Sequence, residues 1–301
     1  MIQSLKRGIL SGWYTTWKLT KIIFPISLSI SLLSYTPVLK WIMELIGPVL
    51  KLIGLPGDAA IPIVLGATLN LYAAIGAMFN LTFTVKEAFI IAIIVSFCHN
   101  LFVETGVAAK LGVKVNIVLG VRVGLALLSA ILIHLLWQGG SEIAQYSFIQ
   151  HSESVITGFF PIIWHSVVKS LTGIWQMAKI VMPLMIAIQY LRDFGWLEKI
   201  SKSLAPAMRF LGLKENTSLT LAAGLAIGLA YGAGVMMQAV EEDGVSKKDI
   251  TVIVLILVSC HAVIEDTFLF VSVGIPILPL FLIRVFVALT VAITASRFIK
   301  V

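Results

Sequence analysis

Two short polar segments interrupt apolar runs of this chain and contain the residues best suited to chemistry. They are Ser96–Thr105 and Ser259–Thr267, and in each a Cys-His pair is followed, five residues after the His, by an acidic residue and a Thr. Ionisable side chains are costly in a membrane interior and usually have a function there. A protonatable carboxylate suits proton or sodium coupling, whereas Cys and His suit iron or zinc.

Each of these side chains also has a structural interpretation. Both histidines can bond a backbone carbonyl, both carboxylates can reach water from a helix end, and both thiols can fill apolar space. Arg122 and Arg284 lie about 12 Å inside later apolar segments, at roughly 1.5 Å per residue. They need partners, and Glu104 and Asp266 are the nearest candidates in the sequence. We therefore predict two intramembrane ion pairs.

The composition indicates an integral membrane protein. Of 301 residues, 59% are hydrophobic and 12% charged, whereas a soluble domain carries roughly 25% charged residues. The mean hydropathy is +1.01 and the net charge +7, and in membrane proteins excess Lys and Arg gathers in cytoplasmic loops. Adjacent Cys and His side chains point about 100° apart on a helix, which does not suit a catalytic dyad. We expect a membrane protein that is not an enzyme.

An internal repeat relates the two polar segments. A shift of 158 residues, increasing to 162 after residue 240, aligns residues that rarely coincide by chance. The aligned pairs include Trp17/Trp175, Lys21/Lys179, Pro25/Pro183, Gly66/Gly224, Cys98/Cys260, His99/His261 and Arg122/Arg284. We predict a first repeat at 1–137 with a core at 37–137, a connector at 138–154, and a second repeat at 155–301 with a core at 194–297.

The apolar segments predict the membrane topology. Spans are expected at 14–35, 84–105, 115–137, 173–191, 249–271 and 279–296, and amphipathic helices at 2–13, 37–55, 155–171 and 192–212. If Ala59–Phe79 and Ser218–Val240 also crossed, the basic 192–214 cluster would lie outside, against the positive-inside tendency. Re-entrant hairpins at both places put most Lys and Arg inside.

The predicted fold is therefore all-α, with two inverted-topology repeats. It has about six membrane-spanning helices, two re-entrant helical hairpins and interfacial amphipathic helices. Both termini and residues 199–214 are expected in the cytoplasm, and residues 138–154 outside.

Inverted repeats with interrupted helices are typical of secondary transporters, whose solute site lies between the repeats. The predicted solute-binding residues are Asn70, Tyr72, Ser96, His99, Asn100, Tyr231, Gln238, Ser259 and His261. The predicted ion-coupling residues are Glu104, Thr105, Glu265, Asp266 and Thr267. An alternative metal site would use Cys98, His99, Cys260 and His261.

The order of elements resembles a known family. An interfacial helix, a Gly-rich hairpin, a helix interrupted by the Cys-His…Glu/Asp-Thr motif, and a last span look like the nucleoside-recognition or "gate" domain family. The resemblance covers about residues 37–137 and 194–297. That family includes bacterial spore maturation proteins and is related to concentrative nucleoside transporters and to the membrane part of ferrous-iron permeases.

We accordingly expect an ion-coupled secondary transporter of a small polar solute, nucleoside-like or a small organic anion, working by alternating access. The alternatives are a divalent-metal permease for iron or zinc and a non-transporting membrane scaffold. We expect no cofactor other than a coupling Na⁺ or H⁺. The expected partners are the solute and the lipid bilayer, with no nucleic acid, and a homo-oligomer is left open. The predicted location is the cell (inner) membrane.

Overall fold

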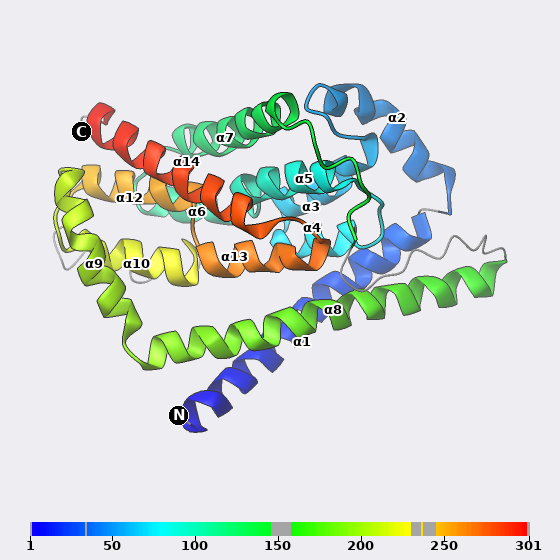
Figure 1. The fold of residues 1–301 in the computed structure, drawn as a ribbon, viewed down its shortest axis with the longest axis horizontal. Coiled ribbons are helices and arrows are strands. Elements are labelled where there is room, and N and C mark those ends of the chain that lie inside the picture. Colours follow the sequence, from blue (N-terminus) through cyan, green and yellow to red (C-terminus); the bar gives the residue numbers. More distant parts are fainter. Residues whose placement is uncertain (1, 34, 146–157, 230–235, 237–244, 300–301) are drawn as a thin grey trace.

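The computed structural model of the chain describes residues 2–33, 35–145, 158–229, 236 and 245–299. These residues form helices joined by short loops, with no strand among them (Figure 1), so the predicted all-α class is confirmed. The helices are α1 (Ile2–Leu33), α2 (Pro37–Lys51), η1 (Gly57–Ala59), α3 (Ala60–Thr68), α4 (Leu71–Met78), α5 (Val85–Cys98), α6 (Leu101–Lys110), α7 (Val115–Leu136), α8 (Phe159–Asp193), α9 (Trp196–Phe210), α10 (Thr217–Ile227), α12 (Lys247–Ser259), α13 (Val263–Leu269), η2 (Phe270–Val273) and α14 (Ile277–Phe298).

Five segments of the described chain are long and apolar enough to cross a membrane: Val85–Lys110, Val115–Leu136, Phe159–Tyr190, Lys247–Val273 and Ile277–Phe298. The sixth crossing, predicted at 14–35, overlaps the second part of α1, in which the apolar stretch is Ile23–Leu33. Lys18 and Lys21 interrupt the apolar run. α1 nevertheless packs across α8, its counterpart in the second repeat (Figure 1).

The predicted boundaries inside these two long helices are wrong. Separate amphipathic helices were expected to end near residues 13 and 171, yet α1 is continuous over 32 residues and α8 over 35. The glycines near those points pack closely instead of ending a helix. A Cβ at Gly8 would lie 2.9 Å from Ile186 Cα, and one at Gly173 would lie 3.0 Å from Phe79 Cδ2. Small residues in membrane helices often serve such close approaches.

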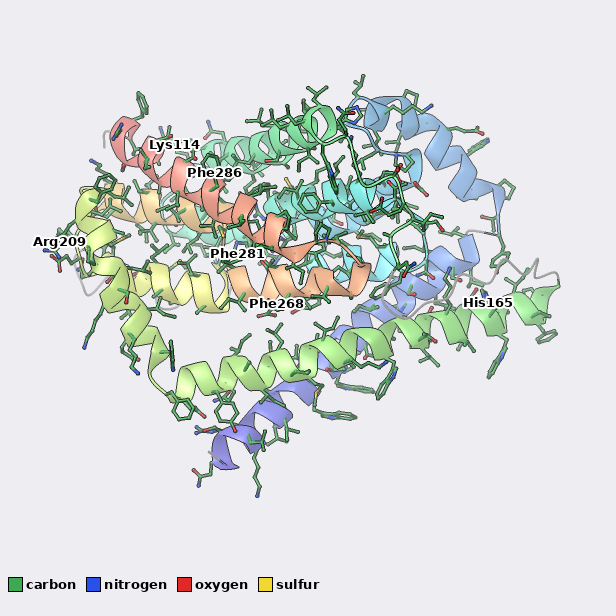
Figure 2. The ribbon with its side chains drawn as sticks, in the orientation of Figure 1. Lys114, His165, Arg209, Phe268, Phe281 and Phe286 are labelled. Carbon is green, nitrogen blue, oxygen red and sulfur yellow. The ribbon has the colours of Figure 1, made fainter. Side chains whose placement is uncertain are left out.

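The two halves of the molecule run in opposite directions. α7 is antiparallel to α14, and α5 to α12 (Figure 1). One end of the bundle holds Lys114, Arg209 and the end of α14, as Figure 2 shows. The other end holds Gly274, where a Cβ would meet the backbone of Gln145. The predicted inverted repeats are therefore confirmed, with basic residues gathered at one end.

The first hairpin, and the arm α10 of the second half, each pack on the interrupted helix of the same half. α3 and α4 turn at residues 69–70 and return to the end where α3 began (Figure 1). A Cβ at Gly66 in α3 would lie 2.9 Å from Val95 Cγ1 in α5, and one at Gly224 in α10 would clash with Leu257 in α12. The return arm of the second hairpin lies outside the described residues.

The interrupted helices form the centre of the bundle. The most apolar stretches of Val85–Lys110 and Lys247–Val273 are each 78% buried inside the protein. The corresponding stretches of the other three candidate spans are 12–28% buried. Phe286 on α14 (Figure 2) is 69% exposed, as a lipid-facing side chain would be. The polar segments singled out in the sequence therefore lie where the protein is most shielded.

A capping box starts the first interrupted helix. The Thr84 hydroxyl accepts a hydrogen bond from Glu87 N (3.3 Å), and the Glu87 carboxylate accepts one from Thr84 N (2.7 Å). Asp58, at the entrance to the first hairpin and outside the spans, lies near this carboxylate. Burial, and then the negative charge of Glu87, raises the pKa of Asp58 to about 6.

Candidate functional site

The functional site is built where two central helices are broken. α5 ends at Cys98 and α6 begins at Leu101, while α12 ends at Ser259 and α13 begins at Val263. Asn100 (φ 50°) and Ala262 (φ 41°) are the non-glycine residues with left-handed backbone in the described chain, and they lie at corresponding points of the two breaks.

Each break is held by the tip of the hairpin in its own half. Asn100 N donates to Gly66 O (2.8 Å), and Ala262 N donates to Gly224 O (3.2 Å). A backbone N–H that loses its helical partner inside a membrane must find another acceptor. The repeat pair Gly66/Gly224 supplies that acceptor on both sides, and this contact is what makes the hairpins part of the site.

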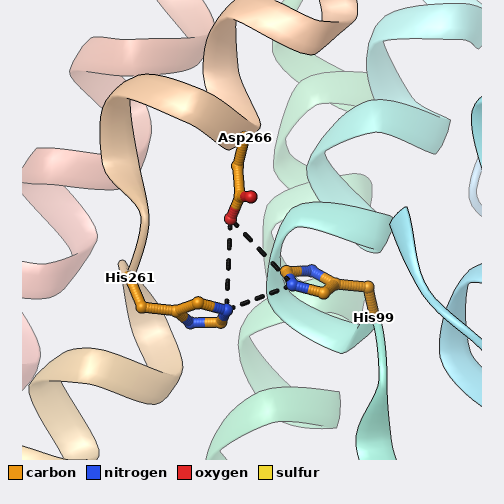
Figure 3. Close-up of side chains that lie close together, drawn as sticks. All are labelled: His99, His261 and Asp266. Carbon is orange, nitrogen blue, oxygen red and sulfur yellow. Dashed lines mark hydrogen bonds and ion pairs between the residues drawn. The ribbon is translucent and has the colours of Figure 1, made fainter. Parts of the chain in front are cut away.

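The two histidines face each other at the centre. His99 Nδ1 lies 2.9 Å from Val95 O, and His261 Nδ1 lies 2.8 Å from Leu257 O. Because a carbonyl can only accept, each Nδ1 carries the hydrogen, and in the neutral rings each Nε2 is left with a lone pair. The two Nε2 atoms are 3.1 Å apart, and Figure 3 shows them pointing at each other.

Two carboxylates complete the arrangement. Glu104 Oε1 lies 3.1 Å from His261 Nε2 and 3.4 Å from His99 Nε2. Asp266 Oδ2 lies 4.0 Å from each Nε2 (Figure 3). Glu104 and Asp266 are 3% and 7% exposed. Both carboxylates therefore contact the same histidine pair, although they come from opposite halves.

Two fully buried arginines bind these carboxylates and the opened backbone. Arg122 Nη1 lies 2.9 Å from Glu104 Oε2, and Arg122 also donates to the carbonyls of Phe97 and His99. Arg284 makes the corresponding contacts: 3.2 Å to Asp266 Oδ2 and 2.9 Å to the carbonyl of His261. The guanidinium groups thus replace helical hydrogen bonds that each break removes.

We call His99, His261, Glu104, Asp266, Arg122 and Arg284 the central cluster. Its inward-facing atoms are two imidazole nitrogens and two carboxylate oxygens. All four are acceptors while the carboxylates are ionised and the histidines neutral. Acceptors this close repel each other unless a proton or a metal ion lies between them, so the arrangement is suited to binding a cation.

The other residues predicted from the sequence surround the cluster. Thr267 accepts from Arg284 (2.8 Å), and Tyr72 on the first hairpin donates to Glu265 in the second half. Asn70 caps α4 by accepting from Ala73 N (2.9 Å). The Ser259 hydroxyl donates to Leu255 O (2.8 Å).

The remaining predicted residues do not join the cluster through their side chains. The hydroxyls of Ser96 and Thr105 are buried without a hydrogen-bond partner in the described chain, and Asn100 contributes its backbone N–H. Tyr231 and Gln238 lie outside the described residues.

The cysteines are not where the alternative metal site would place them. Cys98 Sγ lies 3.4 Å from Arg122 O, and Cys260 is buried and free. Among the described residues, His99, His261 and Asp266 have ligand atoms within 4.8 Å of one another, and Glu104 Oε1 lies closer still to both histidines. Carboxylate oxygens, rather than the thiols of the alternative prediction, therefore face the histidine pair.

The backbone carbonyl groups that hold the site together were not predicted from the sequence. The carbonyls of Val95 and Leu257 orient the histidines, and those of Gly66 and Gly224 hold the breaks. The coincidence of Gly66 with Gly224 in the repeat was the signal that could have indicated a shared contact.

Two known proteins are similar to this chain, one in sequence and one in structure. The chain is 52% identical to the uncharacterized membrane protein YvoD of Bacillus subtilis (strain 168) over 288 residues, which cover 95% of this chain and 92% of that protein. A solved structure of a CNTnw variant in an outward-facing state matches with a TM-score of 0.40 and 12% identity, covering 93% of this chain and 72% of that one.

A family model named Gate and described as nucleoside recognition matches residues 16–115 and 174–276. The two matched segments contain the two hairpins and the two interrupted helices, one set in each half. The chain therefore belongs to the Gate (nucleoside recognition) family of membrane proteins, and contains the family's unit twice.

Proposed function

We propose that this protein is a secondary transporter of a small polar solute, coupled to a cation bound by the central cluster. The family description favours a nucleoside-like solute, and a small organic anion is the other class to be tested. The proposal places the protein in the cell membrane with its basic end, which includes Lys114 and Arg209, in the cytoplasm.

The observation that supports this proposal most is that both inverted halves contribute side chains to the central cluster. His99 and Glu104 come from one half, His261 and Asp266 from the inverted other half, and the four meet at the two helix breaks. A site shared by two inverted halves can be exposed to one side or the other when the halves move relative to each other. A buried scaffold would not need acceptors that repel one another.

The contacts between the halves favour coupling. Tyr72 on the first hairpin bonds Glu265, which directly precedes Asp266 of the cluster. A cation that draws Glu104 and Asp266 together would therefore also move residues that touch the hairpin. Polar side chains on that hairpin, such as Asn70, are our candidates for solute contact.

Uptake into proteoliposomes tests the proposal. Labelled uridine, adenosine and a dicarboxylate are each offered with no gradient, or with an inward gradient of protons, of sodium or of Zn²⁺. We expect one solute class to accumulate in a gradient-dependent way. Glu104→Gln and Asp266→Asn should abolish the gradient dependence, while the matched control Glu142→Gln, on an exposed loop, should not.

Two results would contradict the proposal. If none of the solutes enters under any gradient, the protein does not transport these classes. If both carboxylate variants respond to the gradient like the wild type, the central cluster is structural and the coupling site lies elsewhere.

A further inference from the structure

Three atoms of the central cluster form a triangle with the dimensions of a metal site. The sides are 3.1 Å between the two Nε2 atoms, 3.1 Å from Glu104 Oε1 to His261 Nε2, and 3.4 Å from Glu104 Oε1 to His99 Nε2. Zinc lies roughly 2.0–2.2 Å from imidazole nitrogen and carboxylate oxygen. In a tetrahedral site those bonds put neighbouring ligand atoms about 3.3–3.5 Å apart, and in an octahedral site about 3 Å apart.

The surroundings of the triangle are those expected around metal ligands. Metal-binding histidines nearly always donate the other ring N–H to a carbonyl or carboxylate, and His99 and His261 donate theirs to Val95 O and Leu257 O. Arg122 holds the far oxygen of Glu104 at 2.9 Å, which leaves Oε1 directed at the histidines.

We propose that the central cluster binds a divalent first-row transition-metal ion through His99 Nε2, His261 Nε2 and Glu104 Oε1. Asp266, 4.0 Å from each histidine, is near enough to bind as a fourth ligand after a small movement, or through a water. This inference rests on the proposed function and deepens it, because it gives the cation that the transporter uses.

The donor atoms select the class of ion. Sodium, magnesium and calcium prefer oxygen ligands, whereas imidazole nitrogen suits zinc and iron. Two histidines with one carboxylate form the set found in many non-haem Fe(II) sites.

Charge sets the expected strength of binding. The two arginines already balance the two carboxylates, so a divalent ion brings two uncompensated positive charges into a buried site. We expect micromolar rather than nanomolar affinity, which suits an ion that must be released during a transport cycle.

Zinc binding to the purified, detergent-solubilised full chain tests the inference without any transport measurement. We expect one Zn²⁺ per chain by calorimetry and a saturable rise in melting temperature with Zn²⁺ or Fe²⁺, but not with Mg²⁺ or Na⁺. His99→Gln, His261→Gln and Glu104→Gln should each weaken binding by at least about 10-fold, the lower end of what even outer-shell changes cost. His165→Gln, outside the cluster, is the matched control and should bind normally.

X-ray absorption of the zinc-loaded wild type does not depend on how well variants fold. Nitrogen and oxygen ligands near 2.0–2.1 Å are expected, without sulfur near 2.3 Å. The inference is overturned by a sulfur shell, by a lack of saturable binding, or by unchanged binding in the folded glutamine variants. Solute uptake without metal binding would overturn this inference and leave the proposed function standing. Metal binding without uptake of any solute would leave this inference standing and overturn the proposed function.

Discussion

Replacing Arg122 with Ala is the sharpest test of how the central cluster is held together. Arg122 is fully buried and binds three groups: the Glu104 carboxylate and the carbonyls of Phe97 and His99. Arg122→Ala leaves all three without this donor. We expect a folded but much less stable protein.

The magnitude follows from those three partners. Removing one member of a buried ion pair costs about 3–5 kcal/mol, because the other charge is left unpaired. Each buried acceptor left unsatisfied costs about 1–3 kcal/mol more. Glu104→Gln leaves the Arg122 charge unpaired in the same way, but it keeps an amide oxygen for Arg122 and leaves both carbonyls with their donor. Arg122→Ala should therefore destabilise the protein by at least about 2 kcal/mol more than Glu104→Gln.

The double variant Arg122→Ala/Glu104→Gln separates the charge effect from the carbonyl effect. It leaves no unpaired charge, so it should be more stable than Arg122→Ala alone. The assay is thermal and denaturant unfolding in detergent with a thiol-reactive dye, because Cys98 and Cys260 are 7% and 2% exposed and react on unfolding. If the double variant is no more stable than Arg122→Ala, the ion pair does not dominate and our account of the cluster is wrong.

Three further predictions concern topology, pH and packing. In a chain without its native cysteines, Ser141→Cys should be labelled from outside the cell and Ser203→Cys only from inside; labelling of both from one side would contradict the orientation. Burial raises the pKa of Asp58 to about 6, so stability should fall as pH rises from about 4 through 6. Asp58→Asn should remove this fall in stability. If melting curves of the variant still show it, Asp58 does not cause the pH dependence. Gly66→Ala should lower the melting temperature because its Cβ would contact Val95, whereas Gly106→Ala, with no atom within 4 Å, should not; equal effects would refute the packing argument.

Much of the fold could be predicted because the sequence repeats. The matched pairs indicated two equivalent halves, and the distribution of Lys and Arg indicated that the halves are inverted. Helix ends were less predictable. Helix boundaries were expected near residues 13 and 171, but Gly8, Gly12 and Gly173 serve close contacts inside continuous helices. Those contacts, with Ile186, Met182 and Phe79, are tertiary, so the local sequence does not indicate them.

The cluster could be located in the sequence, but its bonding could not. The motif indicated the histidines and carboxylates, and the two arginines stood out because they lie inside later apolar segments. It also suggested Cys98 and Cys260 as alternative ligands. A helix break of two or three residues redirects every following side chain, so spacing alone could not decide whether thiols or carboxylates face the histidines. The breaks themselves occur at Asn100 and Ala262, neither of which is a glycine that would indicate a left-handed backbone.

The residues at the two breaks make the halves unequal in energy. Left-handed backbone costs an ordinary L-residue roughly 1–2 kcal/mol, and asparagine tolerates it better than alanine. Asn100 therefore carries its conformation at lower cost than Ala262. The second break is therefore the costlier of the two to form. A glycine at position 262 would adopt the same left-handed backbone without that cost, so Ala262→Gly should stabilise the folded protein.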